Sequence, residues 1–183
     1  MVKISAWRPR PEAKLSVRAH WEIERHLERH LEASGLNWST LRPTGHMRNF
    51  FTGEGGFAHD QAVAGPYGTG AVAYIDTADV AACAAALLTG PGEAYPLTGP
   101  VALTHAEIAG KLAVPFRDQS PGEAAESLRK SGLPDWFVDD LLWLYADMAS
   151  GAMSGVTSAV QELTGRPPRA FDDFLAARRG RER

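Results

Sequence analysis

The 183-residue chain has little cysteine, little net charge and no long apolar run. Its single cysteine, Cys83, stands in an alanine-rich apolar segment, so no disulfide can form within the chain and a buried thiol is expected. No stretch approaches the ~18 consecutive apolar residues that a membrane-spanning helix needs. The opening segment Met1–Ser5 is too short and too polar for a signal peptide. We therefore expect a cytoplasmic protein that does not enter a membrane.

The charge balance gives no reason to expect a polyanionic partner. The formal net charge is -3 and the sequence pI is near 6.1. A nucleic-acid-binding domain usually carries a clear basic excess. The arginines gathered at the C-terminus, Arg178, Arg179, Arg181 and Arg183, are expected to lie in a solvated tail. The composition predicts one globular unit that does not bind nucleic acid, which leaves a small-molecule substrate possible.

The first hundred residues alternate between strand-like and helix-like patterns. An apolar periodicity at helical spacing runs from about residue 16 to 34, through Val17, Trp21, Ile23, Leu27 and Leu31. An alanine-rich helix is expected at 78–88, capped by Asp76 or Thr77. Strands are expected at 2–6, 36–41, 71–75 and 95–98, with a long glycine-rich loop over 52–70. This order predicts an α/β protein with a parallel, helix-flanked sheet over residues 1–100.

From about residue 101 onward the pattern is nearly all helical. The sequences from Thr104 to Glu107 and from Ser120 to Glu123 are capping boxes, each at the start of a helix. Further helices are expected at 135–149, 156–163 and 170–179. The aromatic residues Trp136, Phe137, Trp143 and Tyr145 are expected mainly in the core. We assign residues 101–183 to a C-terminal helical lobe that faces the substrate.

Several segments together resemble the NmrA-like family of NAD(P)-binding proteins, which are atypical short-chain dehydrogenases. The resemblance rests on their order and spacing along nearly the whole chain. The segments are Lys3–Ala6, the helix with His20 and Glu24, Ser34–Pro43, Met47–Phe50, Gly70–Asp76, Asp79–Ala81, Leu97–Pro100 and Leu163–Pro168 with Phe171 and Phe174. The resemblance implies a Rossmann-like domain, NADP or NAD as cofactor, and an NAD(P)H-dependent oxidoreductase.

The same resemblance implies that the chain covers only the C-terminal part of the family fold, from about the fifth strand of the sheet. Family members hold the pyrophosphate on a Gly-x-x-Gly-x-x-Gly loop after their first strand, and no such motif occurs here. The segment Gly53–Ala58 matches Gly-x-Gly-x-x-Ala, but no strand leads into it and no helix follows it. We therefore expect a truncated chain without the cofactor loop, whose exposed sheet allows self-association.

Short-chain dehydrogenases that reduce carbonyls use a Tyr-x-x-x-Lys pair on the helix after the fifth strand. Between residues 16 and 34 this chain has neither residue type. His20 and Glu24 stand one helical turn apart there and are the candidate catalytic pair. The alternative interpretation is an exposed pair within one helix. His26 and His30 have metal-ligand spacing but lack a third ligand, so no metal site is predicted.

Open α/β sheets bind ligands beyond the carboxyl ends of their strands, and residues 42–49 follow such an end. In the family this segment and the loop at Ser5 border the nicotinamide and the substrate. Ser5 and Pro43 are therefore the candidate cofactor contacts, and Met47 and Asn49 the candidate substrate contacts. A plain exit from strand to loop, with Asn49 capping a turn, is the alternative. Two other functions stay open besides reduction: non-catalytic NAD(P) sensing, and an inactive gene fragment.

Overall fold

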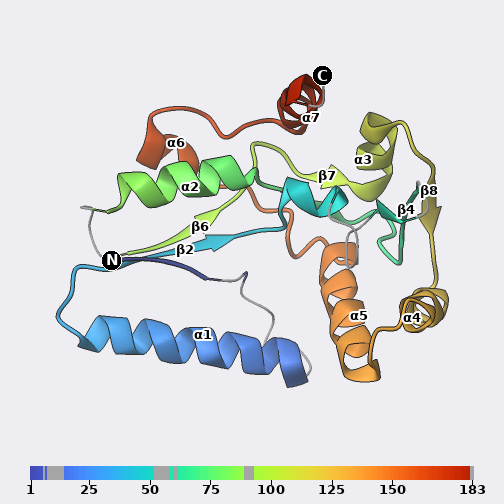
Figure 1. Cartoon of the computed structure of the whole chain (residues 1–183), viewed down its shortest axis with the longest axis horizontal. Helices are drawn as coiled ribbons and strands as arrows, with labels where there is room; N and C mark the ends of the chain where they lie inside the picture. The colour runs from blue at the N-terminus through green and yellow to red at the C-terminus, as the bar shows by residue number, and fades with distance from the viewer. Residues whose placement is uncertain (6, 8–14, 52–57, 60–61, 89–92, 182–183) are drawn as a thin grey trace.

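The computed structural model describes residues 1–5, 7, 15–51, 58–59, 62–88 and 93–181. Its main sheet contains three strands in the order β1-β2-β6, and both pairings are parallel. The strands are β1 (Val2–Ile4), β2 (Ser39–Pro43) and β6 (Ala94–Leu97). In Figure 1, α1 (Leu15–Ala33) lies on one side of this sheet, and α2 (Thr77–Ala86) and α6 (Ala159–Thr164) lie on the other. The predicted parallel, helix-flanked sheet is thus confirmed.

The local signals at the helix ends act as expected. The Asp76 carboxylate accepts a hydrogen bond from the Ala78 N–H at 3.0 Å and caps α2. The helix α6 ends at Gly165, which has the left-handed φ of 73° that glycine adopts without strain. Both capping boxes are present: that of Thr104 begins α3 (His105–Leu112), and that of Ser120 begins α4 (Pro121–Lys130). The last long helices are α5 (Asp135–Ala149) and α7 (Phe171–Arg181).

Two expectations about strands were wrong. The region expected as one loop contains β3 (Ala58–His59) and β4 (Ala62–Gly65), and β4 pairs in parallel with β8 (Phe116–Asp118). The strand expected at 71–75 is reduced to β5 (Ala71–Val72), antiparallel to β7 (Leu103–Thr104). Residues beyond 101 are therefore not almost all helical. These strands are two to four residues long, too short to show periodicity, and partners far along the chain stabilise them.

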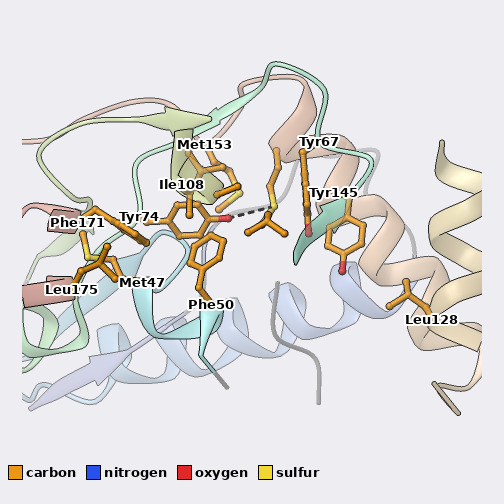
Figure 2. Close-up of a cluster of buried hydrophobic side chains, with 14 of the residues drawn as sticks. Met47, Phe50, Tyr67, Tyr74, Ile108, Leu128, Tyr145, Met153, Phe171 and Leu175 are labelled. Atoms are coloured by element: carbon orange, nitrogen blue, oxygen red, sulfur yellow. Dashed lines mark hydrogen bonds between the residues drawn. The ribbon is translucent and has the colours of Figure 1, made fainter. Parts of the chain in front are cut away.

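Buried side chains form two clusters. One lies under α2 and α6 and includes Leu41, Cys83 and Val160, which confirms the expected burial of the thiol. The larger cluster extends from Met47 to Leu175 along the chain and includes Tyr67, Tyr74 and Tyr145 (Figure 2). The backbone at Gly99 passes so close to this cluster that an added Cβ would stand 1.9 Å from the Tyr74 carbonyl oxygen. Glycine is required there by packing.

The aromatic residues of α5 divide between core and surface. Tyr145 is buried, and its ring meets that of Tyr67 edge to face at 5.1 Å. Trp136 is 64% exposed, and Phe137 beside it is also exposed, so the prediction of core burial was wrong for both. Both residues stand in the first turn of α5, whose buried residues begin at Val138.

The helix α1 packs with only part of the face that its apolar pattern predicts. Trp21, Glu24, Glu28 and Leu31 are half-buried or buried. Ile23 and Leu27, both expected in the apolar face, are exposed at 59% and 44%. The face turned to the rest of the molecule thus carries two carboxylates, and an apolar pair is left on the surface.

The parallel sheet begins at β1, and β1, α1 and β2 make a complete strand–helix–strand unit. The sheet is thus Rossmann-like from the start of the chain. None of the helices in the described ranges combines the length and hydropathy that a membrane crossing requires.

Candidate functional site

The carboxyl ends of β1 and β2 lie side by side. Ile4 pairs with Leu41, and the Ser5 N–H donates to the Leu41 carbonyl at 2.7 Å. Pro43, the last residue of β2, pairs with Leu97 of β6. Ser5 and Pro43 are both buried. The parallel register therefore brings the two predicted cofactor contacts to one edge of the sheet.

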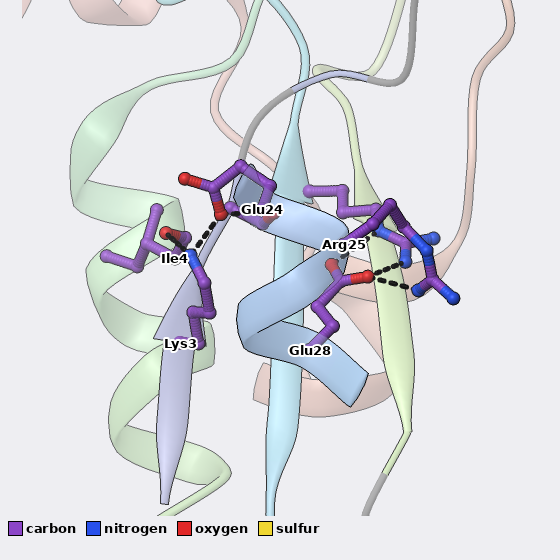
Figure 3. A network of polar contacts seen from close by, with 7 residues as sticks. Lys3, Ile4, Glu24, Arg25 and Glu28 are labelled. Carbon is purple, nitrogen blue, oxygen red and sulfur yellow. Dashed lines mark hydrogen bonds and ion pairs between the residues drawn. The ribbon is translucent and has the colours of Figure 1, made fainter. Parts of the chain in front are cut away.

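Ser5 and Glu24 are in direct contact. The Ser5 hydroxyl donates to Glu24 Oε2 at 2.9 Å. Lys3 Nζ forms an ion pair with the same oxygen (Figure 3). Glu24 thus joins α1 to the end of β1. The sequence predicted Ser5 and Glu24 separately, and it missed Lys3. The spacing of Lys3 and Ser5 could have identified Lys3, because residues i and i+2 of a strand share one face.

His20 lies in α1 one turn before Glu24, but its side chain is outside the part of the chain that the structure describes. The interaction of His20 with Glu24 therefore stays a prediction. Glu24 itself is no simple surface residue, because only 13% of its side chain is exposed and two groups from β1 contact it.

A second carboxylate is buried one turn further along α1. Glu28 is 1% exposed and accepts hydrogen bonds from Arg42, at 3.2 Å from Nε and 2.7 Å from Nη2. Arg25 pairs with the same carboxylate (Figure 3). Burial on its own raises the pKa of Glu28, but the bonds from Arg42 and Arg25 outweigh it and hold the pKa below its ordinary value. Glu28 is therefore ionised and ties α1 to β2.

The loop after β2 turns at once into the short 3-10 helix η1 (Met47–Phe50). Met47 is 1% exposed and belongs to the larger core cluster, so it supports this loop from below and lines no open surface. Asn49 is half-buried, and its N–H donates to the His46 carbonyl at 3.0 Å, closing the turn. The proposed substrate contacts of Met47 and Asn49 stay predictions.

His46 is a candidate that the sequence analysis missed. It directly precedes η1, and burial lowers the pKa of its imidazole below the ordinary value, so the ring is neutral at pH 7. Its place three residues after Pro43, just beyond the end of a parallel strand, was the signal that could have identified it.

Ser5 and Pro43 lie at adjacent strand ends, on the edge where open α/β sheets bind ligands. Most of the Gly53–Ala58 segment, rejected above as a cofactor loop, lies outside the described residues. In the described ranges no three His, Cys, Asp or Glu side chains lie close enough together to hold a metal ion.

No family model matches the chain. Among curated proteins it is 32% identical over 159 residues to an NAD(P)H azoreductase of Xenophilus azovorans, which covers 82% of this chain and 56% of that protein. It is 35% identical over 161 residues to a (4-alkanoyl-5-oxo-2,5-dihydrofuran-3-yl)methyl phosphate reductase of Streptomyces griseus, covering 84% of this chain and 57% of that one. The chain thus spans just over half the length of these relatives.

Solved structures show the same fold. An NADPH-dependent quinone oxidoreductase from Escherichia coli superposes with a TM-score of 0.77 at 22% identity, over 96% of this chain and 66% of the other. A triphenylmethane reductase from Citrobacter gives a TM-score of 0.70 at 19% identity, over 96% and 65%. The likeness includes the strand–helix–strand unit at the start of the chain. The fold is Rossmann-like. In sequence the chain is similar to the azoreductase and to the phosphate-ester reductase named above.

Proposed function

We propose that this chain forms the substrate side of an NAD(P)H-dependent reductase. The observation that carries the proposal is the cluster of Ser5, Glu24 and Lys3 at the carboxyl end of β1, beside the end of β2. In an open α/β sheet this edge is where ligands bind. The related reductases support the chemistry.

Each residue has a role in this proposal. A bound nicotinamide supplies a hydride, and Ser5 and Pro43 border its ring. The reduced acceptor then needs a proton, which His20 donates from α1. Glu24, held by Ser5 and Lys3, balances the charge of the imidazolium. Asn49 borders the acceptor, and Met47 holds the η1 turn in place.

We propose a quinone-like or aromatic acceptor. By their names, the related proteins reduce azo compounds and a furanone phosphate ester, and the structural neighbours a quinone and a triphenylmethane dye. These acceptors share a conjugated, electron-poor centre that can take up a hydride, and the quinone, the azo bond and the furanone also take up a proton. The alternative, NAD(P) sensing without reduction, predicts dinucleotide binding and no turnover.

We also propose that these residues do not include the family's pyrophosphate loop, because no Gly-x-x-Gly-x-x-Gly motif occurs in the sequence. The chain spans 56% and 57% of the two relatives named above. NADPH should then bind to the 183-residue chain weakly or not at all. Nicotinamide fluorescence or calorimetry measures this, with the Xenophilus azoreductase as a positive control. One-to-one binding with a micromolar dissociation constant would contradict the assignment.

The test of the reductase proposal is NADPH oxidation with a panel of quinones, azo dyes and aldehydes. In an active protein, His20→Ala should lower kcat by roughly 10²–10⁴, which is the usual contribution of a positioned acid. Glu24→Gln should cost less, because Glu24 orients the imidazole and does not carry the proton. His26→Ala, on an exposed position of the same helix, is the matched control. Unchanged turnover in His20→Ala would show that His20 is no proton donor.

A further inference from the structure

A cavity of about 560 Å³ lies between the start of α2, the η1 turn and α7. The helices α2 and α7, which supply most of the lining, lie on the side of the main sheet opposite α1 (Figure 1). Its volume is within the range of small-molecule sites. Its lining is Arg48, Asp76, Thr77, Ala78, Ala81, Arg169, Phe174, Ala177 and Arg178.

The lining carries a net positive charge in a chain whose formal net charge is -3. Three arginines face one carboxylate, Asp76, which Arg169 already binds at 2.6 Å. Within the described ranges Arg48 has no carboxylate at ion-pair distance. The guanidinium of Arg178 lies 4.3 Å from the centre of the Phe51 ring, a cation–π contact that fixes its position.

The rest of the lining is apolar and small. Ala81 of α2 and Ala177 of α7 are both exposed, and Phe174 of α7 is half-buried. The cavity therefore combines cationic side chains with an apolar wall that suits a flat ring. The first turn of α2 adds a weak preference for negative charge.

We propose that this cavity binds a small organic anion. The charged group, a phosphate or carboxylate, contacts Arg48 and Arg178, and the apolar body packs on Phe174, Ala81 and Ala177. Guanidinium groups bind such oxyanions with charge-assisted hydrogen bonds, and the concave surface shields them from water. The site does not depend on the proposed reductase activity, because it uses none of the residues at the end of β1.

Calorimetric titration of the full chain with phenyl phosphate at low salt tests the site. We expect one site with a dissociation constant of about 1 mM or tighter. Affinity should fall as salt is added. Arg48→Gln and Arg178→Gln should each weaken binding about tenfold, the effect of losing one charge-assisted hydrogen bond. Arg117→Gln, on an exposed residue of β8 outside the cavity, is the matched control and should leave affinity unchanged.

Two further arms locate the ligand and define its chemistry. Ala81→Phe and Ala177→Phe fill the cavity from exposed helix positions and should abolish binding while the melting temperature is retained. Benzoate should bind and benzyl alcohol should not. No binding of phenyl phosphate to the unaltered chain, or full affinity in both arginine variants or in both folded phenylalanine variants, overturns the proposal. Equal affinity for benzyl alcohol contradicts an anion site.

Discussion

At the residue scale, His105 is a titratable side chain that the fold buries among aromatic rings. His105 is fully buried, its Nε2 lies 2.9 Å from the Tyr74 hydroxyl, and its ring stacks on Tyr67 at 3.6 Å. Burial lowers the pKa of His105 to about 3. The folded protein therefore keeps this imidazole neutral at pH 7 and in mild acid.

This burial predicts a loss of stability in mild acid. Between pH 6.5 and about 3 the unfolded chain binds a proton on His105 that the folded chain does not bind. The free energy of unfolding should thus fall as the pH falls below 6.5, by up to about 1.4 kcal/mol for each pH unit. Urea unfolding at about pH 7 and about pH 5 should differ by about 2 kcal/mol from this residue.

The control separates His105 from other titrating groups. His105→Phe removes the polar partner of Tyr74 and should lower stability at all pH values, but it should also remove this part of the pH dependence. His26→Ala, at an exposed position, should keep the full dependence. Identical pH slopes in His105→Phe and the unaltered protein would refute the prediction.

At the residue scale, the sequence identified the types of group at the site but not their partners. Ser5 and Glu24 were both candidates, and the structure brings them to 2.9 Å. The strand spacing places Lys3 on the same face as Ser5, but its ion pair with Glu24 depends on how α1 is oriented over β1. Met47 was expected to contact substrate; its side chain is 1% exposed and belongs to the larger core cluster.

At the scale of elements, local signals predicted the helices well and the short strands badly. The capping boxes of α3 and α4 and the Asp76 cap of α2 are encoded within four residues, so their positions could be read from the sequence. The strands β4 and β8 pair across about fifty residues, and no local pattern records such a partner. The buried face of α1 could not be predicted from its local pattern either, because Glu24 and Glu28 are buried by partners near β1 and in β2.

Glu28 of α1 forms an ion pair with Arg42 of β2 and so connects the helix to the sheet. Glu28→Gln would leave Arg42 and Arg25 without their common counter-charge while keeping the size of the side chain. We expect the free energy of unfolding to fall by about 2 kcal/mol, below the usual cost of breaking a fully buried pair because both arginines are partly exposed. Chemical denaturation measures the loss.

Glu126→Gln is the control for this prediction, because the pair of Glu126 with Lys130 is exposed on α4. It should leave stability without measurable change. A Glu28→Gln variant as stable as the Glu126→Gln variant would show that the buried cluster contributes nothing to the docking of α1.

At the scale of the whole molecule, the β1 edge of the main sheet has no neighbouring strand among the described residues. Within the described ranges β1 pairs with β2 alone, so its other edge presents unpaired backbone groups. Ile4, at the end of this strand, is 56% exposed. Ile23 and Leu27 stand one turn apart on α1 and are exposed as well. Larger exposed apolar surfaces of this kind are a common mark of association.

We therefore predict that the 183-residue chain associates with itself through β1 and α1. Sedimentation velocity over a range of concentrations should show a monomer that gives way to larger species as the concentration rises. Ile4→Lys combined with Ile23→Lys should shift the distribution back to monomer, because charges at a strand edge and on an apolar face oppose pairing. Val156→Lys changes an equally exposed apolar residue away from this side and should leave the association intact.

A single monomeric species at every concentration would refute the prediction. Equal effects of Val156→Lys and the double variant would place the contact elsewhere.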